Sequence, residues 1–163
     1  MGEVALKMPP VGKLATVLYI DDDAANRQAF AAAFRHDLHV LTCSDITEAM
    51  ALLDKEVVHV VIADQRMPGL TGSQVLHLIK ERYPTVRRML MTGYSHIQAV
   101  IDAINLGGVS HYLTKPWDHS QVIHAVERAH AEFERDVERS EFTQRLVEAN
   151  RQLEFALRQR LLS

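Results

Sequence analysis

Four points of the sequence carry side chains suited to phosphoryl-group chemistry, and each follows a short apolar run. They are Asp21-Asp22-Asp23 after ATVLYI, Asp64 after VVHVVIA, Thr92-Gly93 after VRRMLM and Lys115-Pro116 after SHYLT. Neighbouring carboxylates repel at neutral pH unless they share a proton or a cation. Oxygen ligands without His or Cys favour Mg²⁺ or Mn²⁺, and a hydroxyl and an ammonium add contacts to phosphoryl oxygens. The set fits phosphoryl transfer with a single aspartate as nucleophile.

Each of these positions has a simpler explanation when it is taken alone. The acidic run at 21–23 could cap a helix N-terminus, and Asp64 could cap a loop. Thr92 could be structural, and Lys115 could lie on the surface. Four such positions at four strand ends are hard to explain in this way, so we favour one common site.

The elements that must position these side chains are predicted from alternating apolar and amphipathic stretches. Five strands are predicted at 15–20, 38–43, 57–63, 86–91 and 110–114, and helices begin near Ala24, Asp45, Thr71, Ser95 and Asp118. Strict alternation is typical of βαβ units, which form a doubly wound parallel sheet with helices on both faces. Ligands of such α/β folds bind beyond the carboxyl ends of the strands, where the four positions fall.

Two terminal segments lie outside this alternating region. Residues 1–13 are predicted to be a flexible leader before a domain at 14–131. No glycine or proline occurs from Trp117 to Ser163, so one helix can continue beyond the domain as an extension at 132–163. Its apolar residues follow an a/d-like spacing over about two heptads, namely Phe142, Leu146, Ala149, Leu153 and Ala156. We favour a dimerising or linking coiled coil over a solvated helix that packs on its own domain.

The bulk composition excludes several classes of function. The chain of 163 residues has a formal net charge of -3 and one cysteine, Cys43, in an apolar run. We expect a buried, inert thiol and a cytoplasmic protein. The sequence shows no clustered basic face of the kind that binds nucleic acid. It also shows no apolar segment of the ~20 residues needed to span a membrane. The nine histidines show no convincing metal-binding spacing.

Four motifs in residues 15–131 resemble a known family. YIDDD, VVIADQRMPG, LMTGYS and YLTKPWD occur in the order and spacing of the receiver domain of two-component response regulators, the CheY-like family. The segment that contains TGYS and TKPWD is similar to receivers fused to HD-GYP phosphodiesterases or to hydrogenase-regulator-type activators. The resemblance implies a flavodoxin-like (βα)5 fold with strand order 2-1-3-4-5. It also implies a histidine kinase or phosphotransfer protein as partner. The chain is either a fragment whose output domain is missing, which we favour, or a stand-alone receiver with a helical tail.

The resemblance implies roles for individual residues. Asp64 would accept the phosphoryl group with Mg²⁺, or Mn²⁺, as cofactor. Asp22 would bind the metal directly, Asp21 mainly through water, and the backbone carbonyl of Arg66 would complete the protein ligands. The Asp23 carboxylate, a third acid, is expected to face solvent or cap the first helix.

The resemblance also implies a switch and a route for the signal. Thr92 would supply the switch hydroxyl and Tyr112 the switch aromatic ring. Lys115 would contact the phosphoryl oxygens, and the Lys115-Pro116 peptide bond is expected to be cis. The face formed by helix 4, strand 5 and helix 5 would change shape and control a homodimer or an output domain.

Two other functions remain as alternatives. An aspartate-nucleophile phosphatase would use the same acids for turnover, but that class needs a second aspartate two residues after the nucleophile, where this chain has Arg66. A pseudo-receiver would use the fold only to dimerise. The complete set of acids together with Thr92 and Lys115 argues against it, and we expect a signalling protein without enzymatic turnover.

Overall fold

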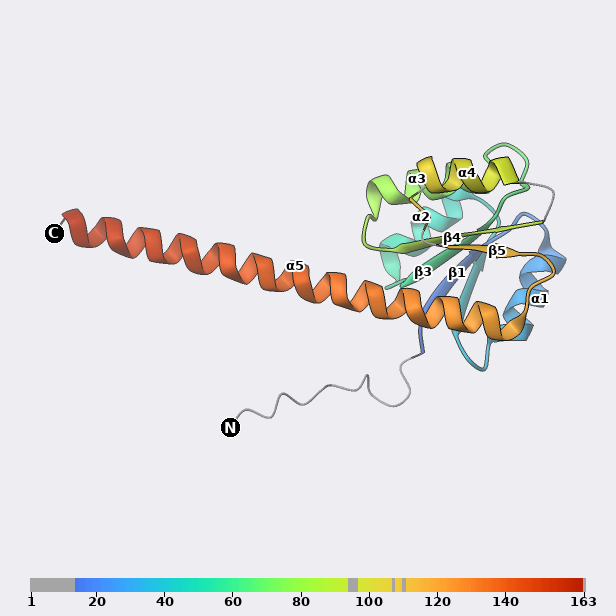
Figure 1. The fold of residues 1–163 in the computed structure, drawn as a ribbon, viewed down its shortest axis with the longest axis horizontal. Helices are drawn as coiled ribbons and strands as arrows, with labels where there is room; N and C mark the ends of the chain where they lie inside the picture. Colours follow the sequence, from blue (N-terminus) through green and yellow to red (C-terminus); the bar gives the residue numbers. More distant parts are fainter. Residues whose placement is uncertain (1–13, 94–96, 107, 110, 163) are drawn as a thin grey trace.

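The structure is a computed structural model that describes residues 14–93, 97–106, 108–109 and 111–162. The predicted leader at 1–13 and the predicted helix start at Ser95 lie outside these residues. Strands and helices alternate along the chain (Figure 1). The elements are β1 (Thr16–Ile20), α1 (Ala24–Phe34), β2 (His39–Cys43), α2 (Ile46–Lys55), β3 (Val60–Asp64), α3 (Gly72–Arg82), β4 (Arg87–Thr92), α4 (Ile97–Leu106), β5 (His111–Thr114) and α5 (His119–Leu162).

The five strands form one parallel sheet. Their order is β2-β1-β3-β4-β5, which confirms the predicted flavodoxin-like topology. The chain reverses its direction of winding between β1 and β3, which pair with Val17 opposite Val60. Ligand sites of doubly wound sheets lie at this reversal, beyond the carboxyl ends of the strands. The fold therefore directs the residues after β1 and β3 to one edge.

Alternate residues of the central strands fill two separate cores. Val17 and Tyr19 of β1 pack with α1 and α5 on one face, whereas Leu18 and Ile20 pack with α2 and α3 on the other. All four side chains are fully buried. A strand covered on both faces needs apolar residues at every position, because successive side chains point to opposite sides.

The strand boundaries differ slightly from the prediction. We expected β3 to begin at residue 57, but it begins at Val60, and Val57 is 71% exposed. Neighbouring strands explain the difference, since β1 begins at Thr16 and β4 begins at Arg87, opposite Val60. Residues before His59 have no strand beside them to pair with.

Side chains cap four of the helices at their N-termini. The Thr71 hydroxyl accepts from the Gln74 amide and the Gln74 side chain accepts from the Thr71 amide, which together form a capping box at the predicted helix start. Asp45 also caps α2, but the Glu48 carboxylate accepts from Ser44 rather than closing a box with Asp45. The remaining two caps are Asp23 for α1 and Asp118 for α5.

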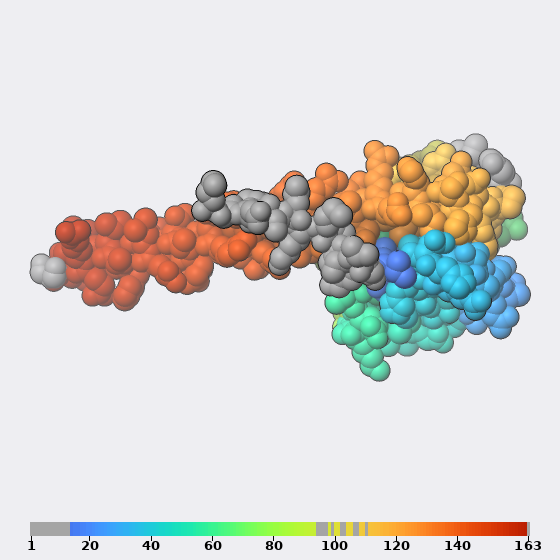
Figure 2. Space-filling model, turned by 90° about the horizontal axis from the view of Figure 1, so that it is seen from below, coloured from blue at the N-terminus to red at the C-terminus, as the bar shows by residue number. Residues whose placement is uncertain are grey.

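Helix α5 continues far beyond the sheet. It has 44 residues, and Phe133 is its last buried side chain. The helix then projects away from the body of the protein, as Figures 1 and 2 show. Large apolar side chains are exposed along this projecting part, namely Phe142, Leu146, Val147, Leu153, Phe155, Leu157, Leu161 and Leu162. Among the described residues, no helix combines the length and apolar character needed to cross a membrane.

Candidate functional site

Three aspartates gather at the carboxyl edge of the sheet. Asp21 follows β1 and is fully buried, Asp64 ends β3 and is 5% exposed, and Asp22 is exposed. One carboxylate oxygen from each residue lies within 4.8 Å of the other two. The topology brings them together because β1 and β3 are neighbouring parallel strands.

Lys115 reaches this group from the segment that follows the edge strand β5. Its Nζ atom lies 2.6 Å from Oδ1 of Asp64 and 3.8 Å from Oδ2 of Asp21. The Lys115 amide donates to the Thr92 carbonyl at 2.9 Å, which ties the segment after β5 to the end of β4. The Lys115-Pro116 peptide bond is cis. The Lys115 ammonium group thus faces the carboxylates of Asp21 and Asp64, which are both buried.

Opposing influences act on the Asp64 carboxyl. Burial raises its pKa, the hydrogen bond and charge of Lys115 lower it, and the neighbouring charges of Asp21 and Asp22 raise it again. The pKa of Asp64 lies above its ordinary value as a result, because loss of solvation is the largest of these effects. Additional positive charge at this edge would favour the ionised carboxylate that a nucleophile requires.

The loop after Asp64 is held in place by short polar contacts. The Gln65 amide donates to the Met91 carbonyl at 3.0 Å, and the Gln65 side chain accepts from the Ser73 amide and hydroxyl. Gly72 begins α3 directly against this turn. A Cβ atom at Gly72 would lie 2.3 Å from the backbone oxygen of Asp64, so only glycine fits. Gly72 was not among the predicted site residues, although it lies only eight residues after Asp64 in the sequence.

Asp21 is held more firmly than the sequence indicated. Its Oδ1 accepts from the Asp23 amide at 3.0 Å, and its Oδ2 accepts from the Tyr19 hydroxyl at 2.7 Å. The Arg27 guanidinium donates to the Asp21 backbone oxygen at 2.8 Å. Tyr19 was not among the predicted site residues, although residues two apart on a strand share a face. The Asp23 carboxylate caps α1, as expected.

The remaining predicted residues lie around this group rather than within it. Thr92 ends β4, is 3% exposed, and donates a long 3.5 Å hydrogen bond to the Gly93 carbonyl. Tyr112 on β5 is 54% exposed and lines a surface groove with Trp117 and Gln121. Arg66 is exposed in the loop after β3. The functional roles of these residues remain predictions.

The donor set of the acidic group fits a hard divalent cation. All three ligand atoms are carboxylate oxygens, which suit Mg²⁺ or Mn²⁺ rather than zinc or copper. Asp22 is exposed and Asp64 is nearly buried, so an ion could bind between a solvent-facing and a protein-facing ligand. Such a half-open position suits Mg²⁺, which retains several of its waters in proteins.

A second group of potential ligands lies at the opposite edge of the sheet. His130 and Glu134 of α5 meet His59, and the two imidazole rings are 4.1 Å apart. The Thr16 amide donates to Nδ1 of His59 at 2.9 Å, so the neutral ring carries its proton on Nε2, which faces Glu134. A metal would need the Nε2 lone pair, so the hydrogen bond opposes metal binding. The contact instead helps to hold α5 against the sheet.

The comparisons with known proteins agree on the family. The model of the response regulator receiver domain matches residues 17–127. Hydrogenase transcriptional regulatory protein HoxA of Cupriavidus necator is 38% identical over 117 residues, which cover 72% of this chain and 24% of HoxA. Response regulator protein FleR of Pseudomonas aeruginosa is 35% identical over 115 residues, 70% of this chain and 24% of FleR. The chain thus spans about a quarter of the length of these curated relatives.

A solved structure gives the same result. The signal receiver domain of an HD domain-containing protein from Pseudomonas fluorescens Pf-5 superposes with a TM-score of 0.74 at 27% identity, and the match covers 82% of this chain and 99% of that one. Both the fold and the family predicted from the motifs are confirmed. Receiver domains generally bind Mg²⁺ at an acidic phosphorylation site, and this chain has an acidic cluster formed by Asp21, Asp22 and Asp64. The chain belongs to the response regulator receiver domain family of two-component signalling proteins.

Proposed function

We propose that this chain receives a phosphoryl group on Asp64 from a histidine kinase or a phosphotransfer protein. The observation that carries the proposal is the contact of Lys115 with a nearly buried Asp64, at 2.6 Å, beside two further carboxylates. A lone buried acid would favour its neutral form, whereas the ammonium keeps negative charge at the end of β3. The rigid central strand holds the nucleophile in a constant position.

The proposed reaction moves one phosphoryl group between two residues. An oxygen of Asp64 attacks the phosphorus of a phosphohistidine, and the new P–O bond forms as the P–N bond breaks. The electron pair of the broken bond stays on the donor nitrogen, and Asp64 becomes an acyl phosphate. Lys115 follows the negative charge from the carboxylate to the phosphoryl oxygens. The Thr92 hydroxyl donates to one of those oxygens.

A divalent ion would complete the site. Asp22 and Asp64 would hold Mg²⁺ or Mn²⁺, with the Arg66 backbone carbonyl as a further ligand and Asp21 acting through water. When bound, the ion neutralises charge on the transferring group and orients its oxygens. Asp21 is suited to an outer position because it is fully buried and already accepts two hydrogen bonds.

The output of the switch is proposed to leave through α5. Phosphorylation would draw Thr92 toward the new oxygens and turn Tyr112 inward, which shifts the populations of two conformations of the α4-β5-α5 face. The receiver domain would span 14–131 and the extension 132–163, whose exposed apolar residues suit a coiled-coil homodimer or a link to an output domain. HoxA and NtrC are transcriptional regulators of which the match covers only 24%, and this favours such an output domain.

Two variants test the proposed acceptor. The protein is incubated with acetyl phosphate and Mg²⁺, and intact mass is recorded with time. We expect one phosphoryl adduct in the wild type and in Asp54→Asn, because Asp54 is an exposed acid paired with Arg82 on another surface. We expect no adduct in Asp64→Asn.

Other results would identify the alternatives. Release of phosphate over many turnovers would indicate the phosphatase. A protein that forms no adduct with acetyl phosphate or with phosphorylated histidine kinases would be a pseudo-receiver. An adduct that persists in Asp64→Asn would place the acceptor elsewhere.

A further inference from the structure

The feature that carries a further inference is the hydrogen bond between Tyr19 and Asp21. The Tyr19 hydroxyl donates to Oδ2 of Asp21 at 2.7 Å, and both side chains are fully buried. Hydrogen bonds to charged groups are shorter and stronger than those between neutral groups. The hydroxyl is thus a buried donor aimed at an acid of the proposed metal site.

The local structure explains why this hydroxyl reaches the acid. Tyr19 and Asp21 lie two residues apart along β1 and its end, so both side chains point to the face covered by α1 and α5. The Tyr19 ring stacks on Phe30 with centroids 4.2 Å apart and planes 6° from parallel. This stacking leaves the ring little freedom, and its hydroxyl therefore lies at a constant place beside the carboxylate.

Two separate donors hold the two carboxylate oxygens of Asp21. Oδ2 accepts from the Tyr19 hydroxyl at 2.7 Å. Oδ1 of Asp21 is held independently by the Asp23 amide at 3.0 Å. Both oxygens of Asp21 are oriented before any ligand arrives, and each retains a further lone pair.

We propose that Tyr19 is a positioning residue that orients Asp21 for Mg²⁺ binding and thereby sets the Mg²⁺ concentration at which Asp64 is phosphorylated. The inference rests on the proposed function, and it adds a residue behind the metal ligands. Groups that hold a ligand in place commonly change metal affinity about 10–100-fold when they are removed. Tyr19 does not contact the phosphoryl group in this scheme, so it acts only through Asp21.

Tyr19→Phe removes the hydroxyl and keeps the stacked ring. In a calorimetric titration with MgCl₂ alone, Tyr19→Phe should bind Mg²⁺ about tenfold more weakly than the wild type. With acetyl phosphate, the Mg²⁺ concentration for half-maximal phosphorylation should rise by the same factor, while the rate at saturating Mg²⁺ stays close to that of the wild type. A merely structural role would lower thermal stability without changing either Mg²⁺ dependence.

Tyr83→Phe is the matched control. The Tyr83 hydroxyl is buried and has no hydrogen-bond partner among the described residues, so its removal should leave Mg²⁺ binding unchanged. In an Asp21→Asn background, Tyr19→Phe should have no further effect on Mg²⁺ affinity, because the two residues act as a unit. Circular dichroism checks that each variant is folded.

The wild-type protein offers a second measurement that requires no variant. A buried hydroxyl bonded to a carboxylate exchanges slowly with water, so its proton can be followed by NMR. Addition of MgCl₂ should shift this resonance.

Several results would overturn the inference. They are wild-type Mg²⁺ affinity in Tyr19→Phe, an equal loss in Tyr83→Phe, or a Tyr19 hydroxyl resonance that does not respond to Mg²⁺. Failure of the proposed function would look different, since the Asp64 adduct would then be missing in the wild type even where Mg²⁺ binds.

Discussion

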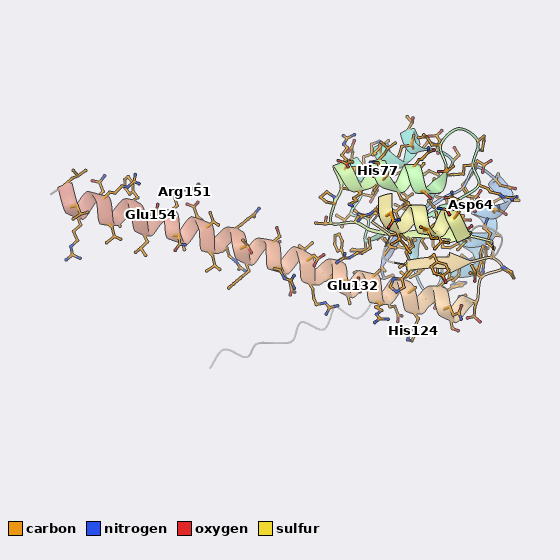
Figure 3. All side chains as sticks on the ribbon, turned by 45° about the horizontal axis from the view of Figure 1, so that its top comes forward. Asp64, His77, His124, Glu132, Arg151 and Glu154 are labelled. Atoms are coloured by element: carbon orange, nitrogen blue, oxygen red, sulfur yellow. The ribbon has the colours of Figure 1, made fainter. Side chains whose placement is uncertain are left out.

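Lys115 and Asp64 are separated by 51 positions in the sequence, yet Nζ of the lysine lies 2.6 Å from Oδ1 of the aspartate. Asp64 ends the central strand β3 and Lys115 follows the edge strand β5, with β4 between them. Figure 3 shows Asp64 at one end of the sheet and Glu132 near the other end, where α5 leaves the domain. The acidic group and the start of the projecting part of α5 therefore lie at opposite ends of one sheet.

Removal of the ammonium should slow phosphorylation. In Lys115→Met, we expect the rate with acetyl phosphate and Mg²⁺ to fall by about 100-fold, since a donor aimed at developing negative charge commonly contributes this much. The adduct is measured by intact mass over time. Lys55→Met removes an exposed lysine from α2 and should keep the wild-type rate. Equal rates in Lys115→Met and the wild type would remove Lys115 from the mechanism.

Loss of the Thr92 hydroxyl should separate phosphorylation from its consequence. Thr92 is buried at the end of β4, the strand next to β3, and its backbone carbonyl accepts from the Lys115 amide. Thr92→Ala should still form the adduct, but its molecular mass in light scattering should no longer depend on phosphorylation. Thr47→Ala, at an exposed position of α2, is the control. Unchanged phosphorylation-dependent association in Thr92→Ala would refute the switch.

Gly72 should tolerate no side chain. A Cβ atom there would lie 2.3 Å from the Asp64 backbone oxygen and 2.8 Å from its carbonyl carbon, so the start of α3 must move. Gly72→Ala should lower the free energy of unfolding by about 1–3 kcal/mol in urea titrations. It should also slow phosphorylation, because the shift displaces Asp64.

Gly93→Ala is the matched control for stability. A Cβ atom at Gly93 would meet nothing within 4 Å, so the free energy of unfolding should change by less than about 0.5 kcal/mol. Equal changes in the free energy of unfolding for Gly72→Ala and Gly93→Ala would show that the close approach to Asp64 does not restrict position 72 to glycine.

Arg87 should anchor α5 to the sheet. Its guanidinium forms ion pairs with Glu132 and Asp136 of α5, and its side chain is only 23% exposed. Arg87→Ala should cost about 1 kcal/mol of unfolding free energy and increase amide exchange in residues 130–136. The phosphorylation rate should not change, because Arg87 begins β4 and the acids lie past the strand's other end.

Arg82→Ala provides the comparison. Arg82 forms an ion pair with Asp54, and the side chains of the two residues are 58% and 47% exposed. Loss of this pair should therefore cost less than about 0.5 kcal/mol of unfolding free energy. If amide exchange of α5 is unchanged in Arg87→Ala, other contacts hold the helix, with the His59 and Phe133 contact as the next candidate.

The sequence predicted much of the fold because its signals are local. Apolar runs, caps such as Thr71 with Gln74, and the absence of glycine and proline after Trp117 depend on neighbours along the chain. The start of β3 was misplaced for the opposite reason. Val57 and Val58 look like strand residues, but pairing begins only where β1 and β4 are present beside the chain.

By itself, the sequence determined the order of the elements, the residue types at the strand ends and the family that these motifs indicate. Only the tertiary structure decided the contacts between distant segments, since packing selects them and spacing does not encode them. The contact of Lys115 with Asp64 and the meeting of His59 with His130 belong to this second class. Tyr19 depends on both the sequence and the tertiary structure. Its place two residues before Asp21 predicts that the two side chains share a face of the sheet. The 2.7 Å hydrogen bond from the Tyr19 hydroxyl to Asp21 depends on how Phe30 holds the ring.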